Sequence, residues 1–512
     1  MNNLNNKPKV NAVFGYIIEV VGEYPYRQKQ IFKTKNVDDA RLILISASSD
    51  KAYLLLDNGK FDIKVGDELI EIEVSNHIYT SDEQFGNVID INGNIVLPIQ
   101  KKVVVDTNGY SSPTFGSTHD LMKVKTLDTQ LYTGIVVVDL LIPIGKGQRE
   151  LIIGDRGTGK THMALNTIIN QSRRGVKSIY VSIGQKREDI SRIYSVLKHY
   201  DAMKNTIIID APSTSAYQQY LAPYIGMAHA ENISHKDDVL IIFDDLTKHA
   251  NIFREIALLT DKPVGKEAMP GDMFFAHSSL LERAGSFKDK KTITALPIIK
   301  TVDGDITSLI ASNVISITDG QIVTSSDLYA QGVLPAINID LSVSRTGSSV
   351  QTRTITKVAG EVNKTFRAYK RHLKLANLDY DFNKETTALL KKGKLIDKMF
   401  NQKGYSLYSD KFILLTSKLI TWNILSGIDN QQKALEFINL LINTNKEASQ
   451  HYETILMNKK HDEKLLRDYF AYSLLQYSNY LGLNWHIEVE NEFVPFDKEY
   501  LDFIVEKLGD KK

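Results

Sequence analysis

A glycine-rich stretch, Gly154–Thr161, holds the residues whose types and spacing best suit phosphate chemistry. It reads Gly154-x4-Gly159-Lys160-Thr161 and matches the P-loop pattern. Glycines allow backbone N–H groups to turn inward around phosphate oxygens, with the N-terminus of a helix behind them. Lys160 would reach the outer phosphates and the Thr161 hydroxyl would ligate Mg²⁺. The expected ligand is therefore a nucleotide, Mg-ATP or ADP.

The sequence on either side of this stretch predicts the elements that the motif requires. The run RELIIG before it is typical of a buried strand, and the run THMALNTIINQ has a helical pattern. A strand, a turn and a helix in this order are the context in which the pattern binds phosphate. The candidate phosphate-binding residues are Gly154, Asp155, Arg156, Gly157, Thr158, Gly159, Lys160 and Thr161.

A pair of carboxylates downstream offers a second candidate for the same chemistry. The apolar run Val239–Phe243 ends in Asp244 and Asp245. A carboxylate at the C-terminal end of a buried strand, beside the P-loop strand, can hold Mg²⁺ through its water shell. Helix capping would explain one aspartate equally well, but beside a P-loop we interpret Asp244 as metal support.

Short strand-like runs fill the first part of the chain, from about Val10 to Val74. Runs such as ARLILISAS and KAYLLLDNG are separated by turn residues, and closely spaced short strands are typical of a small sandwich or barrel. We therefore expect residues 1–79 to form a β-barrel. The segment Ser81–Ser117, rich in Asn, Gly, Ser and Thr, is interpreted as a linker.

Strand-like and helix-like segments alternate in the middle of the chain. Buried runs such as KSIYVSIG, NTIIIDA and DVLIIFDD alternate with helical patterns, which predicts a parallel sheet with helices on its faces. From about Thr354 onward the pattern is helical. The sequence thus predicts a multidomain α/β protein with a β-barrel, a P-loop nucleotide-binding domain at 80–353 and an α-helical bundle at 354–512.

The bulk composition excludes several function classes. The 512 residues are 43% hydrophobic and 24% charged with a formal net charge of +1, so no global field attracts nucleic acid or an anionic membrane. The absence of cysteine excludes disulfides, zinc–thiolate sites and cysteine nucleophiles. No uncharged apolar run approaches the ~20 residues of a membrane span. We expect a cytoplasmic protein that is peripheral to any membrane through its partners.

Several longer stretches are far more specific than the P-loop. They include LIPIGKGQRELIIGDRGTGKT, YVSIGQK, QQYLAPYIG, LIIFDDLTKHA, KEAMPGDMFFAHSSLLERAG, NVISITDGQI and PAINIDLSVSRTGS. In these stretches the chain resembles the alpha subunit of the F-type rotary ATP synthase, from the N-terminal strands to the helical end. The resemblance implies a β-barrel crown, a RecA-like nucleotide-binding domain and a C-terminal helical bundle.

The resemblance also implies partners and a cofactor. In that family, three alpha-like chains alternate with three catalytic beta-like chains in a hexameric ring around a gamma-like central shaft. The alpha-like chain binds a nucleotide that is not turned over. By resemblance, this chain would be a non-catalytic subunit that holds Mg-ATP or ADP. The neutral net charge argues against a nucleic-acid partner.

One position bears directly on hydrolysis. Attack on the γ-phosphate needs a group that orients and polarises a water, and in the family's catalytic subunits a glutamate follows the strand after the P-loop helix. This chain has Gln185 there, in SIGQKRED. A neutral amide can hydrogen-bond a water but is a poor proton acceptor. We expect binding with negligible turnover, unless Glu188 or Asp189 one turn further on substitutes as the base.

Arg345, in LSVSRTGS, has a different expected role. The resemblance identifies it as an arginine finger that projects toward the nucleotide of the neighbouring beta-type subunit. A fixed guanidinium there stabilises the negative charge during phosphoryl transfer, an effect of roughly 10³–10⁵ in rate. Taken without the aligned stretch, an arginine in a serine-rich loop is more often an ordinary surface residue.

The chain departs from the family pattern around the expected base pocket. An arginine usually precedes the PAIN stretch and contributes to the adenine pocket, whereas this chain has Leu334. Of the two glutamines that usually frame the base, Gln402 is present and the second is replaced by Gly404. We expect an intact phosphate site with an altered base site; the alternative for Gln402 is a solvated residue at a helix end.

The N-terminus departs from the pattern as well. The first strand begins near Val10, which leaves no room for the helical extension that ordinary alpha subunits carry. These features favour a divergent mollicute-type version, some of which drive membrane or cytoskeletal machinery other than ATP synthesis. Three alternatives stay open: a catalytic homohexamer of the secretion or flagellar type, an RNA-translocating ring, and a structural scaffold. Gln185 argues against the first, the neutral charge against the second, and the intact Lys160 against the third.

Overall fold

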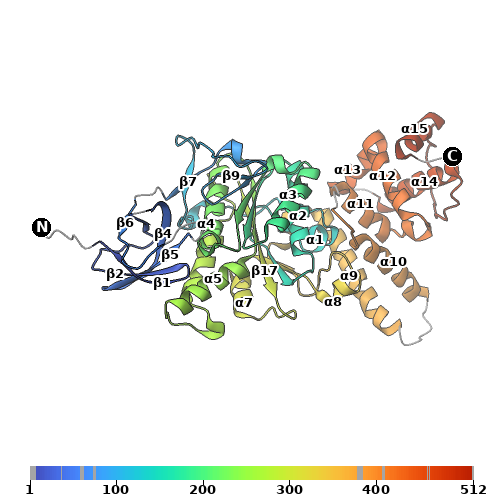
Figure 1. Cartoon of the computed structure of the whole chain (residues 1–512). Helices are drawn as coiled ribbons and strands as arrows, with labels where there is room; N and C mark the ends of the chain where they lie inside the picture. Colours follow the sequence, from blue (N-terminus) through green and yellow to red (C-terminus); the bar gives the residue numbers. More distant parts are fainter. Residues whose placement is uncertain are drawn as a thin grey trace. The chain divides into compact units, whose positions relative to one another are not determined.

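The computed structural model describes residues 7–35, 37–57, 63–72, 76–376, 384–405, 410–457, 459 and 462–509. These residues form two compact units, each discontinuous in sequence. The first unit takes its described residues from Met1–Leu127, Gly145–Gln331 and Ala336–Thr346, and the second from Asp128–Ile144, Gly332–Pro335 and Gly347–Lys512. Figure 1 colours both along the chain.

A six-stranded antiparallel sheet forms the N-terminal part of the first unit (Figure 1). In spatial order its strands are β1 (Lys9–Phe14), β2 (Ile17–Val21), β5 (Lys51–Leu56), β4 (Val37–Ala47), β3 (Ile31–Thr34) and β6 (Leu69–Glu71). An antiparallel bridge between Lys9 and Glu68 joins the two ends, so the sheet curls into a small barrel. Ile18, Phe32 and Leu54 are fully buried inside it. Curling in this way pairs strands that would otherwise be exposed edges.

A nine-stranded sheet forms the centre of the first unit. In spatial order its strands are β19 (Val343–Ser344), β18 (Gly320–Val323), β13 (Leu151–Asp155), β17 (Ile293–Thr301), β16 (Val239–Asp244), β14 (Lys177–Ile183), β15 (Thr206–Ala211), β8 (Val88–Ile89) and β9 (Ile95–Leu97). The seven strands from β18 to β8 are parallel, and the two outer strands are antiparallel to their neighbours. The carboxyl ends of the parallel strands therefore meet at one edge of the sheet.

The helices of the first unit connect and cover these strands (Figure 1). They are α2 (Lys160–Arg173), α3 (Arg187–His199), α4 (Ala216–Ile233), α5 (Leu246–Leu259), α6 (Gly271–Leu281), α7 (Leu309–Ile317) and α8 (Ser326–Ala330). Parallel neighbours need such crossover connections, which is why strand-like and helix-like segments alternate along the chain.

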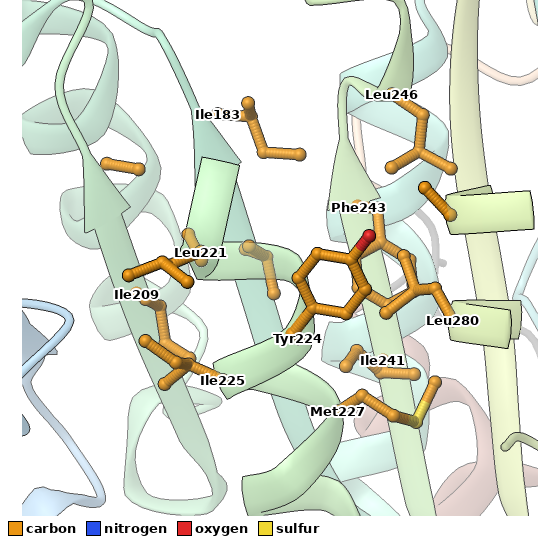
Figure 2. Packing of buried hydrophobic residues seen from close by; sticks show 14 of the residues in the cluster. Ile183, Ile209, Leu221, Tyr224, Ile225, Met227, Ile241, Phe243, Leu246 and Leu280 are labelled. Carbon is orange, nitrogen blue, oxygen red and sulfur yellow. The ribbon is translucent and has the colours of Figure 1, made fainter. Parts of the chain in front are cut away.

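Helix α4 is the most deeply buried of these helices. It contacts β14, β15 and β16, and Gly226 allows the close approach, because a Cβ there would lie 2.5 Å from Cγ2 of Val181. Its residues interdigitate with side chains of the sheet and of neighbouring helices. Figure 2 labels Ile183, Ile209, Leu221, Tyr224, Ile225, Met227, Ile241, Phe243, Leu246 and Leu280 in this core.

The interpretation of Ser81–Ser117 as a linker is wrong in part. Val88–Ile89 and Ile95–Leu97 add β8 and β9 to the central sheet, with β8 parallel to β15. A further pair, β7 (His77–Tyr79) and β10 (Ser111–Pro113), is antiparallel. Strands of two or three residues are too short to show a period in the sequence, and the turn residues between them dominated the composition.

The shorter elements complete the described chain. They are the strands β11 (Gln130–Leu131) and β12 (Ile144–Gly145), and the 3₁₀ helices η1 (Asp82–Gln84), η2 (Leu121–Lys123), η3 (Met203–Asn205), η4 (Lys266–Ala268), η5 (Gly347–Val350) and η6 (Ile424–Gly427).

The second unit is helical. Its helices are α1 (Val136–Leu141), α9 (Arg353–Ala376), α10 (Lys384–Phe400), α11 (Asp410–Thr421), α12 (Gln431–Thr444), α13 (Lys446–Leu456), α14 (Glu463–Leu481) and α15 (Lys498–Leu508). Apolar positions repeat at helical spacing, and the faces they form meet in a core that includes Leu419, Phe437 and Phe470. Phe437 stacks on Tyr477, with ring centroids 4.3 Å apart.

The predicted fold class is confirmed: an N-terminal curled sheet, a central α/β domain and a helical C-terminal region. The boundaries at residues 79 and 353 stay predictions. Over the part of the chain that the structure describes, no helix has the length and apolarity needed to cross a bilayer.

Candidate nucleotide-binding site

The glycine-rich loop lies where the sequence predicted it, between β13 and α2. Gly159 precedes the helix with a φ of 91°, in the left-handed region that favours glycine. Gly154 has a φ of 152°, and a Cβ there would lie 2.1 Å from Oγ1 of Thr324 on the adjacent chain segment. Gly159 therefore meets a conformational demand, whereas Gly154 meets both a conformational and a steric one.

The side chains of the loop hold its shape. The Asp155 carboxylate accepts hydrogen bonds from Thr301 Oγ1 at 2.6 Å and from the Gly304 amide at 2.8 Å. Thr158 Oγ1 donates to the Asp155 carbonyl at 2.8 Å. Arg156 is exposed. The carboxylate of Asp155 thus ties the loop to the end of β17.

Lys160 is buried, with 4% of its surface exposed. Its ammonium group donates to the Asp155 carbonyl, and Thr158 Oγ1 lies 3.4 Å away. Burial and the positive charge of Lys300 lower the pKa of Lys160 to about 8. A nearby negative charge would stabilise the protonated form of this lysine, and a bound phosphate would supply that charge.

The hydroxyl of Thr161 and the carboxylate of Asp244 meet across the loop. Thr161 Oγ1 donates to Asp244 Oδ2 at 2.7 Å, and the Tyr180 hydroxyl donates to the same oxygen at 2.5 Å. Oδ1 of Asp244 is buried and has no hydrogen-bond partner among the described residues. Burial raises the pKa of Tyr180 well above its usual range, so it acts as a neutral donor. The two predicted metal-supporting groups are therefore neighbours.

The second aspartate of the pair does a different job. Asp245 Oδ1 accepts from the Lys248 amide at 2.9 Å and caps the N-terminus of α5. Its other oxygen pairs with the Lys300 ammonium at 2.6 Å. Helix capping thus accounts for Asp245, whereas Asp244 faces the loop and its support of a metal stays a prediction.

These groups suit a phosphate chain with Mg²⁺. A hydroxyl and a carboxylate are oxygen ligands that this ion prefers. The unpartnered oxygen of Asp244 would be satisfied by a hydrogen-bond donor or a hydrated cation at this position. The described residues contain no cluster of three or more His, Cys, Asp or Glu side chains that would bind a metal alone. An ion here would draw its remaining ligands from phosphate and water.

Gln185 lies beside Asp244, at the carboxyl end of β14. Its Nε2 donates to the Asp244 carbonyl at 3.2 Å and approaches the Tyr180 hydroxyl at 3.4 Å. The two acidic alternatives lie in the first turn of α3: Glu188 is exposed, and Asp189 pairs with Arg192 at 2.6 Å. Of these groups, the neutral amide is the one that contacts the site.

Gln402, Leu334 and Gly404 belong to the second unit. The Gln402 side chain accepts from the Val136 amide at 2.7 Å and donates to the Gly134 carbonyl at 3.0 Å. Gln402 is buried rather than solvated. Its backbone N–H donates to the Leu334 carbonyl at 2.6 Å. Gly404 has a φ of 71° and open space where a Cβ would be. The base-binding role expected of Gln402 stays a prediction.

Arg345 lies at the opposite edge of the sheet from the loop. Its amide donates to the Asp319 carbonyl at 2.8 Å, directly after β19, which pairs with the first residues of β18. Because Leu151 is level with Gln321, the pair of β18 and β19 ends at the N-terminal end of β13, whereas the loop follows its C-terminal end. Five strand residues at ~3.3 Å each separate them by about 16 Å. Arg345 therefore cannot reach a nucleotide on its own loop.

Three residues of the site were not expected from the sequence: Tyr180, Lys300 and Thr324. Each belongs to a neighbouring strand or the segment after it, and each contacts the loop or Asp244–Asp245 through cross-strand register. The sequence offered only a weak signal for these residues, because each is a polar residue in or after an apolar run. Which of them face the loop depends on the strand register.

The fold and this geometry define a P-loop nucleotide-binding protein with a RecA-like sheet, a small barrel and a helical bundle. Two family models match the chain. Residues 134–344 match the "ATP synthase alpha/beta family, nucleotide-binding domain", and residues 351–470 match the "ATP synthase alpha/beta chain, C terminal domain". The chain belongs to the ATP synthase alpha/beta family.

Curated relatives show which branch of the family it resembles. The chain is 45% identical over 423 residues to "ATP synthase subunit alpha 2" of Mycoplasmopsis pulmonis, covering 82% of each chain. It is 44% identical over 369 residues to "ATP synthase subunit alpha" of Mesoplasma florum, covering 70% of each. With the protein of that name from Dehalococcoides mccartyi, the identity is 40% over 369 residues, 71% of this chain and 73% of the other. The resemblance to F-type alpha subunits is confirmed, and it implies ATP or ADP binding.

Proposed function

We propose that this chain is a non-catalytic subunit of a rotary ATPase ring that binds Mg-ATP or ADP at Gly154–Thr161 without turning it over. The observation that supports this most directly is Gln185. Its amide lies against Asp244, where a hydrolytic site needs a carboxylate to accept a proton from water. A neutral amide keeps the polar contact and supplies no base.

The chain's own residues would hold the nucleotide as follows. Backbone amides of the loop and the N-terminus of α2 face the phosphate oxygens. Lys160 supplies the positive charge, and Thr161 and Asp244 support the metal, the latter through water. When bound, Mg²⁺ neutralises phosphate charge and fixes the phosphate geometry. The groups expected to hold the phosphates and the metal are present, and Gln185 stands where a catalytic site would have a carboxylate.

Binding and turnover by the isolated chain test this proposal. We expect calorimetry to detect Mg-ATP binding, and Lys160→Ala to remove most of it because a buried phosphate-facing cation is lost. A sensitive phosphate assay should detect no steady-state hydrolysis by either protein. Rapid turnover by the purified chain, or Mg-ATP binding that is indifferent to Lys160→Ala, would overturn the proposal.

We further propose that Arg345 acts in trans, as an arginine finger for a beta-like catalytic subunit that alternates with this chain around a gamma-like shaft. Its position at the edge of the sheet opposite to the loop supports this. The guanidinium is exposed, and it lines a cavity of about 720 Å³ with Asp319 and Thr346. It is therefore placed to meet a ligand that another chain brings.

Kinetics of the assembled ring test the finger. In a ring co-expressed with the beta-like chain, Arg345→Ala should lower turnover by roughly 10³–10⁵ while assembly stays intact. Arg173→Ala, which removes an exposed arginine at the end of α2, is the matched control and should leave turnover unchanged. A ring that keeps most of its turnover without Arg345 would refute the assignment.

The ring would belong to a divergent complex that performs work other than, or besides, ATP synthesis, peripheral to a membrane or cytoskeleton through other subunits. Support comes from the similarity to a protein named "alpha 2" and from Leu334 and Gly404, which replace expected base contacts. Purification of the tagged chain from its native cells, with identification of its partners and bound nucleotide, tests this. Recovery with standard ATP synthase subunits alone would contradict it.

A further inference from the structure

The antiparallel pair of β18 and β19, which Arg345 follows, contacts three consecutive residues that precede β13. The Arg149 guanidinium donates twice to the Asp319 carboxylate, at 2.8 and 3.0 Å, and the Arg149 amide donates to it at 3.0 Å. Gln148 Nε2 lies 3.3 Å from the Asp319 carbonyl and 3.4 Å from Ser344 Oγ. Two of the three residues thus hold Asp319, which precedes β18, and Ser344, which ends β19.

The third residue, Glu150, is wholly buried beneath the pair of β18 and β19. A Cβ on Gly320 would lie 2.3 Å from Glu150 Oε2, so only a glycine lets the two strands approach over this carboxyl group. Oε2 accepts from Gln148 Nε2 at 2.6 Å. Oε1 is buried and has no hydrogen-bond partner among the described residues. Such an oxygen costs free energy until a donor reaches it.

Arg345 is the cation best placed to supply that donor. The Arg149 guanidinium is directed at Asp319, to which it binds in bidentate fashion. Arg345 follows Ser344, which pairs with Gly320 directly above Glu150. Burial and the Asp319 charge raise the pKa of Glu150 well above its usual range, whereas the Gln148 hydrogen bond and the Arg345 charge act against this rise. The positive charge of Arg345, in the same unit, therefore favours the ionised form of Glu150.

We propose that Glu150 is a positioning residue for Arg345: its free oxygen holds the rear of the guanidinium, which leaves the remaining donors facing the adjacent subunit. A guanidinium has five donors in a rigid plane, so it can bind a carboxyl group on one side and a phosphate on the other. A fixed plane costs no reorganisation when charge develops in the transition state. This inference rests on the proposed finger role of Arg345.

Binding of a transition-state analogue to the assembled ring tests the inference. The probes are MgADP with aluminium fluoride and MgADP alone. Glu150→Gln keeps the shape of the side chain and cannot form a carboxylate; we expect it to weaken analogue binding on the order of 10- to 100-fold while MgADP affinity stays unchanged. Asp289→Asn, an exposed carboxylate of the same unit, is the control and should change neither affinity.

The pair of variants separates positioning from a general structural effect. In a ring that already carries Arg345→Ala, Glu150→Gln should cause no further loss, because the group that it positions is gone. Additive losses, or equal losses of MgADP and analogue, would overturn the inference. Glu150→Asp, which withdraws the carboxyl group by one methylene, should give an intermediate loss and serves if Glu150→Gln fails to assemble.

Failure of the inference is distinguishable from failure of the proposed function. If Arg345→Ala weakens analogue binding and Glu150→Gln does not, Arg345 is a finger and Glu150 does not position it. If Arg345→Ala itself leaves analogue binding intact, the finger assignment is wrong and the positioning role falls with it.

Discussion

Lys160 is the residue in which binding and protonation are most closely linked. It is buried next to Lys300, and the free site holds its pKa at about 8. A bound phosphate would favour the charged form and raise this pKa. Below about pH 8 the lysine is therefore protonated with or without nucleotide, and above about pH 8 nucleotide binding requires proton uptake.

We therefore predict that nucleotide affinity is flat below about pH 7 and falls as pH rises through 8, by up to tenfold per unit. Between pH 8 and 9, binding should take up as much as one proton. Calorimetry of the isolated chain in buffers of different ionisation enthalpy measures both quantities. Proton release on binding, or affinity that rises over this interval, would contradict the assignment of Lys160.

Asp244 is the residue on which metal dependence should rest. We predict that Asp244→Asn lowers affinity for Mg-ATP by roughly 10- to 100-fold and leaves affinity for ATP in EDTA nearly unchanged. The amide keeps an acceptor for Thr161 and Tyr180 but lacks the charge that favours a hydrated cation. Parallel titrations with and without Mg²⁺ give the comparison. An equal loss in both conditions would show that Asp244 supports the loop and not the metal.

The residues of the loop could be predicted because the motif is local, with all its members within eight positions. Tyr180 and Lys300 could not, because they reach Asp244 and Asp245 only after three strands have paired in register. The sequence favoured Asp244 as metal support and left open that helix capping explains one aspartate, but it could not show that Asp245 is the cap, since the two side chains are identical. The hydrogen bond to the first turn of α5 identifies the cap.

At the scale of elements, α4 shows how closely this core is packed. Its Gly226 faces Val181 in β14, near the middle of the nine-stranded sheet, where neighbours on both sides prevent the strand from moving. Figure 2 shows the surrounding α4 side chains filling the space over β14, β15 and β16. Close-packed interiors of this kind cannot accommodate even one added methyl group without strain.

We predict that Gly226→Ala lowers the free energy of unfolding by about 1–2 kcal/mol, since overpacking outweighs the helix propensity gained. Gly271→Ala is the matched control in the same unit: it lies at the start of α6 with open space at the Cβ position. It should be neutral or slightly stabilising. Calorimetric unfolding of wild type and the two variants measures these differences. A Gly226→Ala variant as stable as wild type would show that the packing relaxes.

The longer elements were predictable and the shortest were not. Alternating strand-like and helix-like runs gave the parallel sheet, because each run is long enough to show its period. β8 and β9, with two and three residues, were hidden in a turn-rich segment. The position of Arg345 also required the pairing of β18 with β13 and β19, which no spacing in the sequence reveals.

At the scale of the molecule, the first unit presents two chemistries at opposite edges of one sheet. The loop and Asp244 lie at the carboxyl end of the strands, and Arg345 lies at the other end. On the proposed function, a subunit built in this way would hold its own nucleotide on one side and offer a cation to a neighbouring chain on the other, which accords with membership of a family named for alpha and beta chains.

The measurement that tests the account most directly is an experimental structure of the assembled ring with a non-hydrolysable Mg-ATP analogue. The account predicts a nucleotide on Gly154–Thr161 with Gln185 in place of a base. It also predicts the Arg345 guanidinium at hydrogen-bond distance, about 2.7–3.2 Å, from the γ-phosphate held by the adjacent subunit. A guanidinium that faces solvent, far from any phosphate of a neighbouring chain, would contradict it.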